Sequence, residues 1–248
     1  MEQIWQRAIV VGASSGIGEA IAKRLARDGA TVALVARRQS ELERVAREIA
    51  QAGGRAVPFA HDVLDADAAG PLFDRIVAEL GGVDAVVYAS GVLHDFAEGE
   101  WSFQKERETV EVNLVGAMAW LNPAAARFQA QEAGTIIGIS SIAGERGRRG
   151  NPSYAASKAA LTTYLEALRN RLGRYGVRVV TVKPGYIDTA MTRGKPGLFW
   201  LVSADQAADR TLALARRGPV QAFVPARWGL VAFVLKLIPS FIFRRLNF

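Results

Sequence analysis

Short apolar runs alternate with segments of helical periodicity along the whole chain. Runs rich in Val, Ile and Ala predict strands at residues 7–11, 31–35, 56–59, 85–89, 135–140, 177–183 and 222–224. Between them, apolar residues recur at helical spacing over residues 18–28, 40–52, 66–80, 102–128 and 154–175. Uninterrupted apolar strands separated by such helices are typical of a parallel sheet covered on both faces. We therefore predict an α/β fold with a doubly wound sheet of about seven strands.

The chain shows no internal boundary before its last residues. Its 248 residues suit one α/β domain, and no Pro/Ser-rich linker, charge block or repeat divides them. We assign residues 1–226 to this domain and residues 227–248 to an apolar C-terminal tail. The first residues lack the features of a signal peptide, and no segment reaches the roughly 20 apolar residues that span a bilayer. We expect a cytoplasmic protein, although the tail leaves open a peripheral position on the inner face of a membrane.

The amino-acid composition excludes several kinds of catalytic and metal-binding site. The chain has no cysteine, which excludes disulfides, thiolate catalysis and metal sites with Cys ligands. With His61 and His94 as the two histidines, we expect no metal site. The formal net charge is +7, but most basic residues are mixed with acidic ones in the predicted helices. This pattern indicates a solvated surface, and without a basic stripe or recognition motif we expect no nucleic-acid partner.

A glycine-rich turn joins the first predicted strand to the first predicted helix. It reads Gly12-Ala13-Ser14-Ser15-Gly16-Ile17-Gly18. Glycines at these positions allow a tight turn and a close approach of the backbone to a pyrophosphate, which then faces a helix N-terminus. We therefore predict a Rossmann fold whose dinucleotide contacts Gly12, Ser14, Ser15, Gly16, Ile17 and Gly18.

The end of the second strand indicates which dinucleotide binds. An acidic residue there would bond the adenosine ribose hydroxyls and repel a 2′-phosphate. The sequence instead has Ala36 followed by Arg37 and Arg38, whose planar guanidiniums suit a phosphate dianion. We expect NADP(H) rather than NAD(H). The alternative is a solvated arginine pair that opens the next helix.

Two residues follow the third strand at the position where an adenine ring would lie. Asp62 can accept a hydrogen bond from the adenine amino group, and Val63 can pack against the ring. The alternative for Asp62 is an N-cap of the helix that begins at Ala66.

Candidate catalytic residues follow the later strands. Tyr154 and Lys158 lie four residues apart, hence on one helix face. A lysine ammonium, with an oxidised nicotinamide nearby, favours the phenolate and lowers the tyrosine pKa. Ser141 ends a predicted strand, where its hydroxyl can polarise a substrate oxygen. Asn113 stands inside an apolar helical segment, which indicates either a helix irregularity or part of a proton path.

The segment after the sixth strand, with Pro184, Gly185, Ile187 and Thr189, is a candidate clasp for the nicotinamide carboxamide. With this segment the chain resembles the short-chain dehydrogenase/reductase family over about residues 5–190. The family pattern T-G-x-x-x-G-x-G corresponds to residues 11–18, its Y-x-x-x-K to Tyr154 and Lys158, and its P-G to Pro184-Gly185.

The resemblance implies hydride transfer between NADP(H) and a carbonyl or alcohol carbon. It implies that Tyr154 moves the proton and that Lys158 lowers the tyrosine pKa and holds the nicotinamide ribose. By the same resemblance Ser141 positions the substrate oxygen, and Asn113 orders a water relay to Lys158. The residues implied to contact the cofactor also include Ala89 and Gly91.

Two positions depart from the family pattern. Val11 replaces the threonine of the glycine motif, and Tyr88-Ala89-Ser90-Gly91 replaces N-N-A-G after the fourth strand. Both positions support the sheet and the adenosine side, so the catalytic assignment stands. Two other functions stay open: a non-catalytic NADP-binding sensor or scaffold, and an enoyl or imine reductase. The complete set of Asn113, Ser141, Tyr154 and Lys158 argues against the sensor, and Ser141 argues against the enoyl or imine reductase.

Two apolar segments bear on substrate and assembly. Residues 190–203 occupy the place of the family's substrate lid, and their apolar character indicates a hydrophobic ketone or aldehyde, although core packing explains it equally well. The resemblance also implies a homodimer or homotetramer in which helices 102–128 and 154–175 pair. For residues 228–248 three destinations are open: the protein's own cleft, a subunit interface, or a membrane surface. The basic residues that would face anionic head groups are Arg227, Lys236, Arg244 and Arg245.

Overall fold

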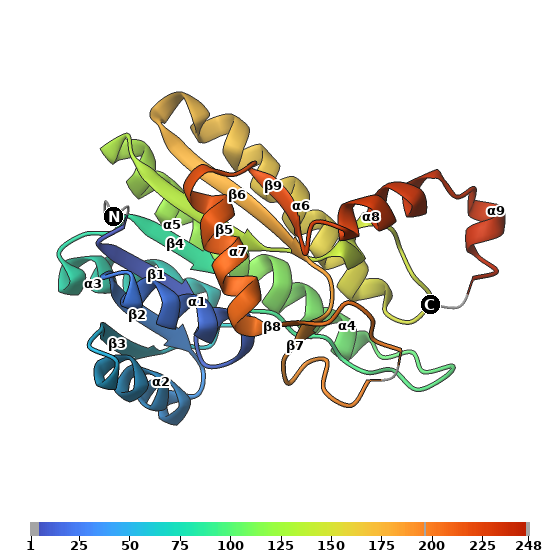
Figure 1. The fold of residues 1–248 in the computed structure, drawn as a ribbon, viewed down its shortest axis with the longest axis horizontal. Coiled ribbons are helices and arrows are strands. Elements are labelled where there is room, and N and C mark those ends of the chain that lie inside the picture. Colours follow the sequence, from blue (N-terminus) through green and yellow to red (C-terminus); the bar gives the residue numbers. More distant parts are fainter. Residues whose placement is uncertain (1–4, 196, 247–248) are drawn as a thin grey trace.

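The computed structural model describes residues 5–195 and 197–246 (Figure 1). Its main sheet has seven parallel strands in the order β3-β2-β1-β4-β5-β6-β9. They are β1 (Arg7–Val11), β2 (Thr31–Ala36), β3 (Arg55–Ala60), β4 (Ala85–Tyr88), β5 (Gly134–Ile139), β6 (Val177–Pro184) and β9 (Gln221–Val224). The predicted doubly wound sheet is confirmed, and each strand matches its predicted range to within one residue at either end.

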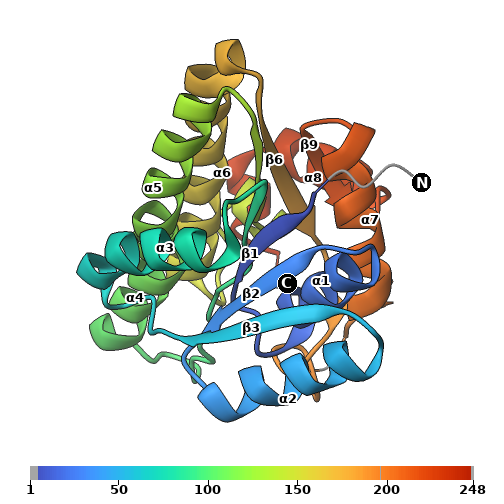
Figure 2. The same ribbon diagram turned by 90° about the vertical axis from the view of Figure 1, so that its left-hand side faces the viewer.

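Helices cover both faces of this sheet, as Figure 2 shows with the sheet between two helical layers. One layer consists of α1 (Gly16–Arg27), α2 (Gln39–Gln51) and α7 (Ala204–Arg217). The other consists of α3 (Ala66–Leu80), α5 (Gly116–Gln131) and α6 (Pro152–Leu172). Successive side chains of a strand point to opposite faces of the sheet and pack in two separate cores. In β1, Ala8 and Val10 face the first layer, and Ile9 and Val11 face the second. Apolar runs without polar alternation follow from this two-sided burial.

The long helix predicted over residues 102–128 is interrupted. It consists of α4 (Phe103–Val110), a π-helical turn (Glu111–Val115) and α5. Asn113 lies within the π turn, fully buried, and its side chain bonds groups outside the helix. Of the two interpretations of Asn113, the helix irregularity is confirmed, and such π turns are frequent at functional sites.

Helix α7 and a small second sheet were not predicted. Helix α7 begins with a capping box at Ser203 and Gln206, and its inner face is mostly alanine. This Ala-rich face packs beside α1 and buries Leu212 among three alanines, so it has few of the large apolar residues that mark a helix period in sequence. Strands β7 (Ile187–Asp188) and β8 (Val202–Ser203) pair in parallel and tie together the two ends of the predicted lid.

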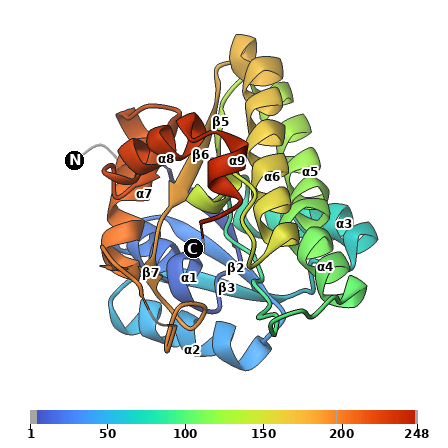
Figure 3. The ribbon, with the colours of Figure 1, turned by 90° about the vertical axis from the view of Figure 1, so that its right-hand side faces the viewer.

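The chain ends in α8 (Trp228–Leu237) and α9 (Ser240–Phe243). They project from the molecule on the side of the carboxyl ends of the strands, and in Figure 3 α9 lies nearest the viewer. Within residues 5–195 and 197–246, no helix combines the length and the apolar character required to cross a bilayer.

Candidate active site

A cleft of about 300 Å³ opens beyond the carboxyl ends of the central strands. It lies where β1 and β4 are neighbours and the strand order reverses, the place where doubly wound sheets bind ligands. Of the predicted cofactor residues, all but Asp62 are on its wall: Gly12, Ser14, Ser15, Gly16, Ile17, Gly18, Arg37, Arg38, Val63, Ala89, Gly91, Tyr154, Lys158, Pro184, Gly185, Ile187 and Thr189.

Two glycines keep the turn after β1 close to its neighbours. Gly12 has φ +92°, and a Cβ there would lie 2.6 Å from the backbone nitrogen of Ser90. A Cβ on Gly18 would lie 2.1 Å from the carbonyl oxygen of Gly12. Neither position can hold a side chain, so the turn packs tightly between β4 and the start of α1. Because α1 begins at Gly16 on the cleft wall, its N-terminus fits an anion such as a pyrophosphate.

Hydroxyl and guanidinium groups gather at the outer end of this cleft. Arg38 Nη2 donates to Ser14 Oγ at 3.0 Å and to Ser15 Oγ at 3.2 Å. Arg37 lies beside it with its side chain 54% exposed, 3.7 Å from Asp62 Oδ2. Planar forks and hydroxyls in this arrangement fit a phosphate dianion.

Asp62 does not line the cleft, and its predicted hydrogen bond to an adenine amino group stays a prediction. Its Oδ1 accepts from the backbone nitrogen of Leu64 at 3.1 Å, and its Oδ2 faces Arg37. Helix α3 is capped by Asp65, whose side chain accepts from the nitrogen of Ala68, so the N-cap alternative for Asp62 is wrong. Val63 and the unpredicted His61 form the cleft wall at this position.

Tyr154, Lys158 and Ser141 come together at the inner end of the cleft. Tyr154 and Lys158 lie on α6, and Ser141 follows β5, with its hydroxyl hydrogen-bonded to that of Tyr154. Lys158 is 4% exposed, and its Nζ donates to the carbonyl of Ile139 at 3.0 Å and lies 5.8 Å from the Tyr154 ring centre. Ser140 Oγ donates to the carbonyl of Lys158 at 2.9 Å, which fixes the end of β5 against α6.

Burial controls the protonation of both catalytic candidates. It raises the pKa of the half-buried Tyr154, and the Ser141 hydrogen bond and the Arg148 charge offset this only in part. Burial lowers the pKa of Lys158 to about 8. Lys158 is not among the groups that shift the Tyr154 pKa in the chain alone, and its predicted effect together with an oxidised nicotinamide stays a prediction. Tyr154 is protonated at neutral pH and can serve as a proton donor.

Asn113 holds the segment after β4 against α6. Its Oδ1 accepts from the nitrogen of Val92 at 2.8 Å, and its Nδ2 donates to Ser157 Oγ at 3.1 Å. A Cβ on Gly91 would lie 3.3 Å from Asn113 Oδ1 and 3.4 Å from Lys158 Nζ. The missing side chain of Gly91 thus leaves a small space between Asn113 and Lys158.

The family model of the short-chain dehydrogenases matches residues 6–196. The chain belongs to this family. An uncharacterized oxidoreductase of Myxococcus xanthus is 32% identical over 98% of this chain and 96% of its own length. Cis-4-hydroxycyclohexanecarboxylate dehydrogenase of Sinomonas cyclohexanicum is 33% identical over 86% of this chain and 81% of its own length.

Solved structures agree with this membership. One from Beutenbergia cavernae, assigned provisionally as an NAD(P)-dependent gluconate 5-dehydrogenase and holding NADP at low occupancy, has a TM-score of 0.82 and 30% identity. The match covers 91% of this chain and 97% of that one. As a short-chain dehydrogenase, the chain is an oxidoreductase of CH–OH or C=O groups that uses a nicotinamide dinucleotide.

Tyr88, one departure from the family pattern, has a local structural role. It is fully buried, and its hydroxyl donates to the carbonyl of Val112 at 2.6 Å. This bond joins β4 to the π turn one residue before Asn113. A tyrosine inside a buried strand requires a hydrogen-bond partner, but the sequence pattern does not identify that partner.

A second cavity, of about 320 Å³, lies on the other side of Tyr154 and Ser141. Lys195 Nζ and Asp95 Oδ1, 2.5 Å apart, join the loop after β4 to the lid beside it. Its apolar lining includes Leu93, Phe96, Ile142, Tyr186, Met191 and Leu198, and its charged lining includes Arg148.

Of the lid residues that indicated a hydrophobic substrate, Met191 and Leu198 line this cavity, whereas Phe199 and Trp200 do not. Phe199 and Trp200 stack instead around Trp228, the first residue of α8, and they remain partly exposed. Packing against Trp228 explains the apolar character of Phe199 and Trp200, and the hydrophobic substrate stays a prediction. Cleft residues that the sequence patterns did not indicate mostly adjoin the predicted ones: Ala36, His61, Ser90, Val92, Val112, Ile139, Ser140, Ala190, Met191 and Thr192.

Proposed function

We propose that this chain is an NADP(H)-dependent reductase of ketones or aldehydes that also oxidises the corresponding alcohols. The observation that carries the proposal is the position of two hydroxyls. Tyr154 and Ser141 are on the walls of both cavities, the one lined by the dinucleotide motif and the one beside the lid. A carbonyl group held in the second cavity can therefore reach both hydroxyls from the side opposite the cofactor cleft.

The cleft suits NADP(H) for two reasons. The glycines of the first turn leave room for a pyrophosphate, and Arg37 and Arg38 with the Ser14 and Ser15 hydroxyls suit the 2′-phosphate. Ala36 ends β2 without the acidic side chain that would bind the ribose of NAD(H). Bound NADPH supplies the hydride that reaches the carbonyl carbon.

The chain's own residues supply and replace the proton. Ser141 Oγ holds the carbonyl oxygen, and the Tyr154 hydroxyl gives its proton to that oxygen as the C=O bond becomes CH–OH. Lys158 binds the nicotinamide ribose from its buried position. A water in the space beside Gly91, between Asn113 and Lys158, can then return a proton to the site.

The second cavity supports a substrate with an apolar body. A specific observation favours a carboxylate on it as well: Arg148 lines the cavity and its charge acts on Tyr154. Among residues 5–195 and 197–246, Arg148 has no hydrogen bond or ion pair that would occupy its guanidinium. The named relative from Sinomonas cyclohexanicum acts on a hydroxy acid. An oxo acid whose carboxylate pairs with Arg148 is therefore the second candidate substrate.

The test is turnover by the purified protein with NADPH and, separately, with NADH. The panel contains apolar ketones and aldehydes, 4-oxocyclohexanecarboxylate, and 4-methylcyclohexanone as its neutral counterpart. We expect oxidation of NADPH with at least one carbonyl class, and much slower oxidation of NADH. Tight NADPH binding without turnover of the whole panel would favour the sensor instead, and reduction of enones at C=C alone would favour the enoyl reductase. A preference for NADH would contradict the cofactor assignment.

A further inference from the structure

Helix α8 is apolar on two opposite faces, and one of these faces packs against the rest of the protein. Trp228, Val231 and Ala232 lie on the inner face and pack against Ile142 and Phe223. Residues 230, 233, 234 and 237 recur at the same helical spacing on the outer face. These outer residues lie in solvent, with Leu230 70%, Phe233 61% and Leu237 65% exposed.

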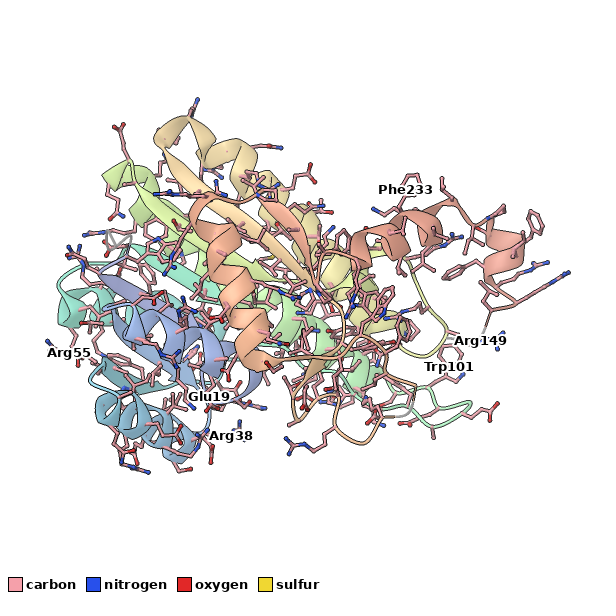
Figure 4. All side chains as sticks on the ribbon, in the orientation of Figure 1. Glu19, Arg38, Arg55, Trp101, Arg149 and Phe233 are labelled. Carbon is pink, nitrogen blue, oxygen red and sulfur yellow. The ribbon has the colours of Figure 1, made fainter. Side chains whose placement is uncertain are left out.

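The outer face continues into α9. Phe241 and Ile242 are exposed there, as is Leu246 just beyond it. Figure 1 shows α8 and α9 standing out from the rest of the molecule, and Figure 4 shows Phe233 on the side of α8 turned away from the sheet. Monomeric proteins rarely expose a contiguous apolar surface of this kind unless it binds something.

The outer face of α8 does not cover the protein's own cleft, because several contacts hold α8 and α9 in their observed position. Glu145, 4% exposed, forms ion pairs with the buried Lys183 and with Lys236 of α8. Arg146 donates to the carbonyls of Leu235 and Ile238 and lies 4.0 Å from the Phe243 ring centre. The outer face could cover the cleft only if these interactions were broken.

Positive charge surrounds the apolar face. The tail itself, from Arg227 to the end of the sequence, contains the basic residues Arg227, Lys236, Arg244 and Arg245 and no acidic residue. Beside α9 lies a basic hollow of about 460 Å³, whose lining includes Arg146, Arg148, Arg149, Arg244, Phe243 and Leu246. Arg149 Nη2 donates to the carbonyl of Arg244 at 3.2 Å, which holds the two walls of the hollow together. Arginines beside apolar side chains suit a phosphate ester that carries hydrocarbon chains.

We propose that α8 and α9 dock this protein on an anionic phospholipid membrane, with the basic hollow receiving a lipid phosphate. Helix α8 has ten residues, so it is about 15 Å long and lies along the membrane surface instead of crossing it. Leu230, Phe233 and Leu237 enter the boundary between head groups and acyl chains, as in interfacial helices. A second copy fits this face less well, because a two-fold contact would bring the arginines of both copies together.

The first experiment is co-sedimentation of the full-length protein with vesicles of phosphatidylcholine, with and without phosphatidylglycerol. We expect binding to the anionic vesicles and its loss at high salt. The variant Leu230→Ser/Phe233→Ser/Leu237→Ser should bind at least tenfold more weakly, because its apolar face is gone. Leu64→Ser is the matched control: Leu64 is 42% exposed and lies outside the tail, so this variant should bind as the unchanged protein does.

A second pair of variants tests the charge. Arg244→Glu/Arg245→Glu should lose binding to anionic vesicles by tenfold or more. Arg47→Glu/Arg55→Glu changes the net charge equally but on exposed residues of α2 and β3, and Figure 4 shows Arg55 at the opposite end of the molecule from α9. This control should keep binding within about twofold. Thermal unfolding of each variant checks that the fold is intact, independently of any enzymatic activity.

Three results would overturn the proposal. The first is that the unchanged protein stays in the supernatant with anionic vesicles. The second is that both charge variants lose binding equally, which would indicate unspecific attraction by the net charge. The third is that light scattering finds self-association that the serine variant abolishes, without vesicle binding, since a second copy would then cover this face.

Discussion

The two cavities that meet at Tyr154 are built from different parts of the fold. The cofactor cleft is lined by residues at the carboxyl ends of β1, β2, β4, β5 and β6 and at the start of α1. The second cavity is lined mostly by loops and the lid, within residues 93–96, 141–155 and 185–195 and by Leu198. Strand ends are positioned by the register of a hydrogen-bonded sheet, whereas the loops depend on a few side-chain interactions such as Lys195 with Asp95.

This difference explains what each cavity reveals about function. The cleft has the geometry that a dinucleotide requires in doubly wound sheets, so each of its residues can be matched to one part of that ligand. The second cavity combines apolar residues with Arg148 in a way that no motif encodes. Four experiments can show whether the two cavities act separately.

The largest effect is expected at the wall that both cavities share. Tyr154→Phe removes the proton donor and keeps the ring, so turnover should fall by about 10² or more while NADPH binding survives. Single-turnover kinetics and NADPH fluorescence titration measure the two quantities. Tyr175→Phe, in the 3₁₀ turn that follows α6, is the control and should keep full activity. Reduction at a near-normal rate by Tyr154→Phe would remove this residue from the mechanism.

Arg37→Gln/Arg38→Gln should affect the cofactor cleft alone. Each charge-assisted bond to a phosphate contributes roughly 1.5–3 kcal/mol. The loss of one such bond to the 2′-phosphate should therefore lower kcat/KM for NADPH roughly tenfold or more, and the loss of a second bond should lower it further. The value for NADH should change little, because NADH has no 2′-phosphate. Arg47→Gln, an exposed residue of α2, is the control. An equal fall for both cofactors would contradict the proposed phosphate site.

Of the two cavities that meet at Tyr154, Arg148→Gln should affect only the second. If the substrate carboxylate pairs with Arg148, kcat/KM for 4-oxocyclohexanecarboxylate should fall about tenfold, the effect of removing one charge-assisted bond. The values for 4-methylcyclohexanone and for NADPH should stay within about twofold. Arg193→Gln, an exposed lid residue, is the matched control. A parallel decrease with the neutral ketone would assign Arg148 a structural role.

The smallest effect is a change with pH on the cofactor side. Burial lowers the pKa of Lys158 to about 8, so its positive charge is present below that pH and is lost as the pH rises through it. Reduction therefore weakens on the alkaline side, and kcat/KM for NADPH, which reports the free enzyme, should fall about fourfold by about pH 8.5. A profile that is level to about pH 9.5 would show that the Lys158 charge is not required.

The residues that could be predicted from the sequence share a physical basis. Gly12 and Gly18 are required by backbone atoms that lie close to them in the turn, and Tyr154 and Lys158 are neighbours on one helix. Such local relations can be recognised from spacing. The alternative that Asp62 caps α3 was wrong, because Asp65 is the carboxylate that caps this helix, and the contact of Asp62 with an adenine stays a prediction. Helix α7 was missed because alanine packs well against α1 but gives a weak periodic signal.

Periodicity and short spacing along the chain were enough to predict the parallel sheet, the dinucleotide turn and the Tyr154–Lys158 pair. Which atoms these residues meet depends on the folded chain. Folding buries Lys158 and Tyr154, and this burial lowers the pKa of Lys158 and raises that of Tyr154. It also divides the apolar residues of the tail between the inner face of α8, which packs on Ile142 and Phe223, and an outer face in solvent. Burial and charge balance depend on residues distant in sequence, so no local pattern can encode them.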